Sequence, residues 1–235
     1  MKYAPWRTAF FVSAVLALGG QPARAEPSGR AVPLVVELFT SQGCSSCPPA
    51  NANLIKLRGR RDVLALSFSV TYWDRLGWKD VFGQEGFTNR QSSYEGPLGH
   101  EGPFTPQIVV NGSRDTVGND YSSIEELLAG RRLSAGPTID LSPTSVALAG
   151  GSAPSSGADV WLVRYDPNVV NVEVRRGENT GRTLPHTNVV HQLQKLGMWT
   201  GGAFKHNFSL AGGGLRTAIL VQIPDGGAIL SAASD

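Results

Sequence analysis

The sequence contains two cysteines, Cys44 and Cys47, separated by two residues. A Cys-X-X-Cys pair can carry redox chemistry, supply half of a metal site or form a structural disulfide. A structural zinc site needs four ligands, and the sequence has no second pair of this kind to complete one. A disulfide that closes so short a loop stabilises a fold by only about 2 kcal/mol. The spacing therefore favours redox chemistry, with metal handling and a structural disulfide as alternatives.

The residues around the pair place it between a predicted strand and a predicted helix. Residues 34–39 are apolar apart from one glutamate, which is typical of a strand buried on both faces. Pro48 suits the first turn of a helix, and apolar residues follow it at helical spacing. Unpaired amides at a helix N-terminus stabilise a thiolate, so we expect Cys44 to attack a substrate and Cys47 to resolve the mixed disulfide.

Further elements follow in an order that resembles a known superfamily. Residues 63–70 form a second apolar run, and Thr105 and Pro106 precede a short strand at 107–110 that enters an Asn111-Gly112 turn. The order of strand, cysteine pair, helix, strand and Thr-Pro resembles the thioredoxin-like superfamily. The resemblance implies that the Pro106 peptide bond is cis, that it faces the cysteines, and that Thr105 pairs with a bound substrate. The alternative is a trans proline that starts an edge strand.

A closer resemblance is to bacterial exported proteins that look like a thioredoxin-like domain of unknown function with an added β domain. It implies an α/β thioredoxin-like domain at 30–135 followed by an all-β, sandwich-like domain at 136–235. Short β-type runs between glycine-rich turns also favour the second of these. The segments that carry the resemblance are ELFTSQGCSSCPP from Glu37, YWD from Tyr72, GWKD from Gly77, TPQ from Thr105, and Arg175–Asn179.

Three more residues are candidates for the site. The resemblance implies that Glu37 assists deprotonation of Cys47, because a carboxyl in an apolar strand could accept a proton near neutral pH. Alternatively, Glu37 reaches water at the strand edge. Trp73 and Trp78 follow the second strand, where parallel sheets gather ligands. They could wall a groove for a peptide or small thiol, or cap the core. The four histidines follow no metal-ligand spacing, and no metal site is expected.

The first 25 residues have the composition of a cleaved secretory signal peptide. A basic start precedes an apolar run at 9–20, and Ala23 and Ala25 are the small residues before the expected cleavage point. An uncleaved membrane tether is the alternative. Without this segment 18 basic and 19 acidic residues remain, a net charge of −1, which argues against nucleic-acid binding. We expect no membrane span after cleavage, because no second run of comparable length is apolar.

These observations predict an exported thiol-disulfide oxidoreductase, periplasmic or secreted, that acts on protein or small-molecule thiols and disulfides without a cofactor. One alternative is a module that binds Cu(I) through the two thiolates, since soft ligands suit that ion. Another is a scaffold that binds a partner while the cysteines stay idle. The residues name neither the redox partner nor the direction of electron transfer.

Overall fold

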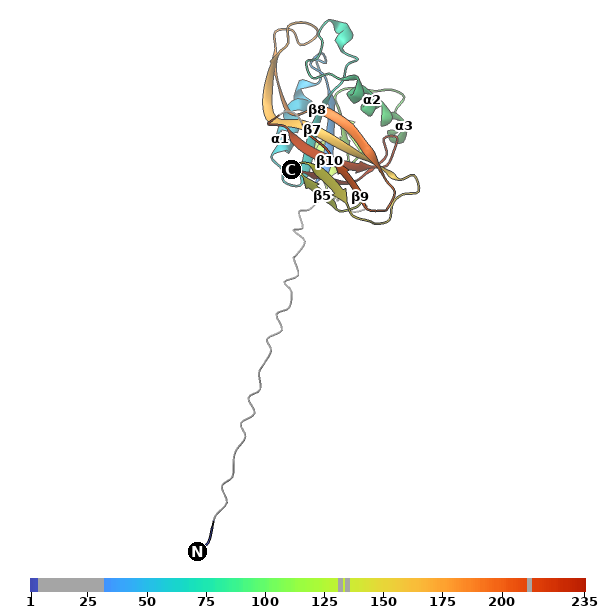
Figure 1. Cartoon of the computed structure of the whole chain (residues 1–235). Helices are drawn as coiled ribbons and strands as arrows, with labels where there is room; N and C mark the ends of the chain where they lie inside the picture. Colours follow the sequence, from blue (N-terminus) through green and yellow to red (C-terminus); the bar gives the residue numbers. More distant parts are fainter. Residues whose placement is uncertain (4–31, 131–132, 134–135, 211–212) are drawn as a thin grey trace. The chain divides into compact units, whose positions relative to one another are not determined.

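The structure, a computed structural model, describes residues 1–3, 32–130, 133, 136–210 and 213–235. The predicted signal peptide lies outside these residues, apart from its first three. Ala31–Asp235 form one compact unit. Its elements are β1 (Leu34–Thr40), α1 (Pro48–Arg58), β2 (Val63–Ser69), η1 (Asp74–Leu76), α2 (Glu85–Ser93), α3 (Glu95–Leu98), β3 (Gln107–Val110), β4 (Arg114–Val117), α4 (Tyr121–Leu128), β5 (Ile139–Ser142), β6 (Ser145–Leu148), β7 (Ala158–Glu173), β8 (Thr183–Trp199), β9 (Phe204–Asn207), β10 (Arg216–Gln222) and β11 (Ile229–Ser234) (Figure 1).

Most of the strands belong to one mixed sheet of eight strands, in the order β11-β10-β7-β8-β2-β1-β3-β4. The pairs β1–β2 and β2–β8 are parallel, and the other neighbours are antiparallel. A second sheet contains three strands, β5-β6-β9. No helix in the described part of the chain is long and apolar enough to cross a membrane.

The predicted fold class is wrong. We expected an α/β thioredoxin-like domain followed by a separate β sandwich, but the chain is mostly β and its main sheet draws strands from both predicted parts. The two parts join where Ser67 of β2 pairs with Val189 of β8. Since β2 is buried along its whole length, it needs a neighbour on this side, and β8 supplies it. The predicted boundary near Gly136 lies between α4 and β5, and its separation of two domains stays a prediction.

Strand β1, which leads into the cysteine turn, lies between two apolar clusters on its opposite faces. Val36 and Leu38 pack with Leu54 and Leu57 of α1, all almost fully buried. Because side chains alternate along a strand, Val35 and Phe39 lie on the other face, in the cluster that includes residues of α2, β7, β8 and β10. Burying each large apolar side chain contributes about 1.5–3 kcal/mol, so the end of β1 and the start of α1 are firmly positioned.

The long β7–β8 hairpin bends before it reaches its tip. The pairing of the strands shifts between Asp166 and Val169, and the opposing Asn188 adopts a left-handed φ of 47°. The Asn188 side-chain amide donates to the Ala65 carbonyl at 2.7 Å, which fixes the bend against β2. A bulge of this kind redirects a strand. The distal half of the hairpin therefore curves past α1 (Figure 1), and residues 174–182, here called the hairpin tip, reach the cysteine loop.

Candidate functional site

The cysteine pair lies in the turn between β1 and α1. Cys44 and Cys47 form a disulfide, and both residues are fully buried although Ser45 and Ser46 between them are exposed. The Ala50 amide donates to the Cys47 carbonyl at 3.0 Å, so the helix starts directly from the second cysteine. The predicted placement of the pair at a helix N-terminus is confirmed.

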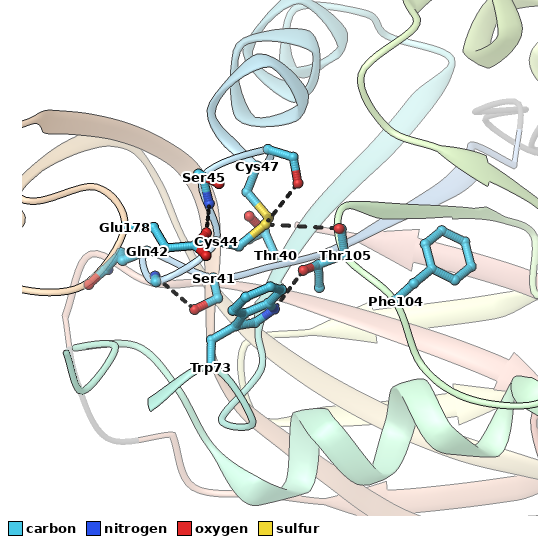
Figure 2. Close-up of a disulfide and its surroundings, with 12 residues drawn as sticks. Thr40, Ser41, Gln42, Cys44, Ser45, Cys47, Trp73, Phe104, Thr105 and Glu178 are labelled. Atoms are coloured by element: carbon cyan, nitrogen blue, oxygen red, sulfur yellow. Dashed lines mark hydrogen bonds between the residues drawn. A yellow bond between two sulfur atoms is a disulfide. The ribbon is translucent and has the colours of Figure 1, made fainter. Parts of the chain in front are cut away.

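Three of the predicted substrate-binding residues, Thr105, Pro106 and Trp73, lie near this disulfide. The Cys44 sulfur is 3.9 Å from the Thr105 carbonyl oxygen, and the Thr105–Pro106 peptide bond is cis, as expected. The Trp73 indole donates to the Thr105 hydroxyl at 2.7 Å, and Figure 2 shows the ring beside the loop that precedes Pro106. The structure thus brings Trp73 and Thr105 to the sulfur of Cys44 from separate segments. Thr105 is 61 residues from Cys44 along the chain.

Trp78 lies against the cysteine loop through a different residue. Its indole donates to the side-chain carbonyl of Gln42 at 2.9 Å, and the Gln42 amide donates to Asp80 at 2.7 Å. A second backbone amide, that of Phe82, also donates to Asp80. Burial raises the pKa of Asp80 to about 6, against the opposing effect of these hydrogen bonds. The segment after β2 therefore holds the loop in place, a role that sequence analysis did not assign to Gln42 or Asp80.

The hairpin tip contributes two residues that sequence analysis did not place at the site. The Asn179 side-chain amide donates to the backbone carbonyls of Gln42 at 3.0 Å and Cys44 at 2.8 Å, and Asn179 is fully buried. Glu178 accepts from the Ser45 amide at 3.0 Å (Figure 2). Both residues belong to a segment that carried the family resemblance, but the linear sequence gives no sign that this segment meets the cysteines.

Glu37 is buried in a polar network on the face of β1 that points away from α1. The Arg90 side chain donates to its carboxylate at 2.6 Å, and the Tyr94 hydroxyl donates to it as well. Burial raises the pKa of Tyr94, so this hydroxyl keeps its proton. Gln222 of β10 completes the network by bonding to Arg90 and Tyr94. These contacts account for both carboxylate oxygens, and the role of Glu37 as a proton acceptor for Cys47 stays a prediction.

The histidines take part in separate local contacts. His186 is buried, its Nδ1 lies 3.5 Å from the Asn51 amide nitrogen, and burial lowers the pKa of its imidazole to about 4. His100 lies 2.7 Å from Asp115. Within the described ranges, no group of three or more His, Cys, Asp or Glu side chains could hold a metal ion.

Comparison with known proteins places the chain in a family. The model of a family described as a protein of unknown function (DUF1223) matches residues 35–222. The chain belongs to this family. Protein AGR_C_4864 from Agrobacterium tumefaciens has a similar crystal structure, with a TM-score of 0.71 and 31% sequence identity over 87% of this chain and 94% of that chain.

A second solved structure shares the fold alone. HBP35 of Porphyromonas gingivalis is 14% identical, with a TM-score of 0.56, over 87% of this chain and 75% of that chain. No functionally curated protein matches the sequence.

Proposed function

We propose that this protein is a thiol-disulfide oxidoreductase whose reacting groups are Cys44 and Cys47. The observation that carries the proposal is the disulfide at the N-terminus of α1, with the Cys44 sulfur beside the Thr105 carbonyl. A thiolate formed at this end of a helix is stabilised by the helix dipole. A purely structural disulfide would stabilise little, since it closes so short a loop.

The chemistry needs only the two sulfurs and a substrate. A substrate thiolate attacks the Cys44 sulfur, the bond between Cys44 and Cys47 breaks, and Cys47 leaves as a thiolate that takes up a proton. A second substrate thiol, once deprotonated, attacks the substrate sulfur of the mixed disulfide, and Cys44 leaves. The substrate loses two electrons and becomes a disulfide, while the pair gains them and becomes a dithiol. In reverse, Cys44 attacks a substrate disulfide and Cys47 resolves the intermediate.

Thr105 and Trp73 are the residues proposed to present the substrate. Within the described chain the Thr105 amide has no hydrogen-bond partner, so it can pair with the backbone of an extended substrate. The partly exposed Trp73 ring, held through its bond to the Thr105 hydroxyl, supplies an apolar wall beside it. Trp78 acts one step further away, by positioning Gln42. We propose protein or small-molecule thiols and disulfides as substrates.

The site has a local arrangement that supports a relation to thioredoxin-like oxidoreductases. This relation concerns the cysteine turn, α1 and the Thr105-Pro106 loop, and not the fold of the whole chain.

We also propose that the protein works outside the cytosol, in the periplasm or secreted, because residues 1–25 have the composition of a signal peptide. An oxidising compartment would let the disulfide persist. N-terminal sequencing of the protein from fractionated cells tests this, and a cytosolic protein that keeps Met1 would overturn it.

A trapping experiment tests the oxidoreductase proposal. Cys47→Ser should accumulate a mixed disulfide through Cys44, whereas Cys44→Ser should accumulate none. The wild type should catalyse exchange with a disulfide-bonded peptide, and neither variant should turn over. Stoichiometric Cu(I) binding by the reduced protein, in competition with a strong chelator and without exchange, would instead favour the copper-binding alternative. The proposal would be overturned if Cys44→Ser still accumulated the mixed disulfide and both variants still turned over.

A further inference from the structure

The hairpin tip is anchored on the cysteine loop from the far end of the sequence. Asn179 bridges the carbonyls of Gln42 and Cys44 and is itself held by Arg182, which donates to its side-chain oxygen at 2.8 Å. Every one of these groups is a neutral donor or acceptor except Arg182. Asn179 thus fixes the tip in place without bringing a charge of its own to the sulfurs.

Glu178 does bring a charge to the loop. Its carboxylate accepts from the amide of Ser45, the residue that directly follows Cys44 (Figure 2). Hydrogen bonds from the Ser45 hydroxyl and amide lower the pKa of Glu178, which is therefore ionised at neutral pH. The carboxylate therefore takes up the Ser45 amide in the turn before α1 and places a negative charge beside Cys44.

We propose that Glu178 is a redox-tuning residue of the Cys44–Cys47 pair, which disfavours the Cys44 thiolate and so shifts the equilibrium toward the disulfide. The reason is Coulombic: a fixed negative charge raises the free energy of a second negative charge beside it. The disulfide carries no charge and is unaffected. Since a pair becomes more oxidising when its reduced form is stabilised, Glu178 makes this pair more reducing. The inference rests on the thiol chemistry of the proposed function.

Other charged groups face the loop through an intervening residue. Asp80 reaches it through the Gln42 amide, and Arg182 through Asn179. His186 faces α1 through Asn51, and burial lowers its pKa to about 4, so it is neutral near pH 7. Among the described residues, Glu178 is the charged side chain that bonds to a residue between the two cysteines, so it is the residue to substitute.

Glu178→Gln tests the inference, because it removes the charge and keeps a side-chain oxygen that can accept from Ser45. The chemically reduced variant is titrated by the ultraviolet absorbance of its thiolate, and both proteins are equilibrated with glutathione. We expect the thiolate to form at lower pH. We also expect the equilibrium constant for oxidation by glutathione disulfide to fall about three- to fivefold, as suits an exposed charge. Arg176→Gln is the matched control, because Arg176 is an exposed residue of the same tip that makes no hydrogen bond or ion pair with the cysteine loop in the described part of the chain.

Glutathione disulfide oxidises the cysteine pair in two steps. The Cys44 thiolate attacks glutathione disulfide and releases one glutathione thiolate. Cys47, after losing its proton, attacks the Cys44 sulfur and releases the second. The pair loses two electrons, and glutathione disulfide gains them. The proposed effect depends on the charge of Glu178 and not on its packing. The thiolate titration of Glu178→Asp should therefore stay close to that of the wild type, and high salt should shift the wild-type titration toward that of Glu178→Gln.

The outcomes separate this inference from the proposed function. An unshifted thiolate titration in Glu178→Gln, or an equal shift in Arg176→Gln, would overturn the role of Glu178 even if exchange is catalysed. A shifted titration in a protein that never exchanges disulfides would uphold the effect of Glu178 on Cys44 and overturn the oxidoreductase proposal. If Glu178→Gln fails to fold, the salt dependence of the wild-type titration decides, and a salt-independent titration would overturn the inference.

Discussion

Glu37→Gln is the variant that best separates a structural glutamate from a catalytic one. The Glu37 carboxylate is fully buried and pairs with Arg90, whose side chain is also almost fully buried. Removing one partner of a buried pair leaves an uncompensated charge, which costs about 3–5 kcal/mol. For a chain of this size each kcal/mol lowers the melting temperature by about 2–4 °C, so we expect a loss of about 6–20 °C.

Urea unfolding and single-turnover resolution of a mixed disulfide are the assays. If the network is structural, Glu37→Gln should lose stability while Cys47 resolves mixed disulfides at the wild-type rate wherever the variant is folded. A control variant, Glu37→Leu with Arg90→Met, should recover much of the loss, because replacing a whole buried pair by apolar residues is often neutral. A stability loss below about 1 kcal/mol together with slower resolution near neutral pH would refute this reasoning and support Glu37 as a proton acceptor.

Three further predictions concern the surroundings of the cysteine loop. Because burial lowers the pKa of His186 to about 4, the wild type should lose about 3 kcal/mol as pH falls from about 6.5 to 4, and urea titrations of His186→Gln should lack this loss. Burial raises the pKa of Asp80 to about 6. The contribution of Asp80 to the free energy of unfolding is therefore present below the usual carboxyl pKa range, and about 3 kcal/mol of it is lost as the pH rises through 6. The difference between Asp80→Asn and the wild type should show that opposite slope, and a flat difference would contradict it. Trp73→Phe removes the donor to the Thr105 hydroxyl and should raise KM for a peptide substrate several-fold with little change in kcat; an unchanged KM would argue that Trp73 only packs.

The local elements around the cysteines could be predicted because their signals lie within a few residues. The apolar run of β1, the prolines that open α1 and the Asn111-Gly112 turn after β3 each describe a short stretch of backbone, and the structure has all three. The Thr105–Pro106 peptide also took the expected conformation. Such features depend on sterics and on backbone hydrogen bonds that close over short distances.

The architecture beyond these elements was mispredicted because strand pairing is not local. The short β-type runs expected beyond residue 136 include Val160–Tyr165 and Val169–Glu173, which are not separate strands but parts of the single bulged strand β7. Residues 183–199 form β8, which the sequence does not announce, because the stretch around the buried His186 and Thr187 lacks the apolar run that is typical of a central strand. Once β8 pairs with β2 the main sheet becomes continuous, so β7, β8, β10 and β11 belong to the same sheet as the N-terminal strands.

By itself the sequence determined where the cysteine pair lies in the local structure, since two cysteines at this spacing before a helix place the proposed reacting atoms wherever the rest of the chain lies. Only the tertiary structure decided what surrounds them. Asn179 reaches Cys44 across 135 residues, and it does so because the hairpin bends at Asn188. The direction of Glu37 was decided in the same way: side chains alternate along β1, α1 covers one face, and the buried Arg90 meets the carboxylate on the other. Contacts of this kind depend on which surfaces the whole chain buries together, a property that no short stretch of residues carries.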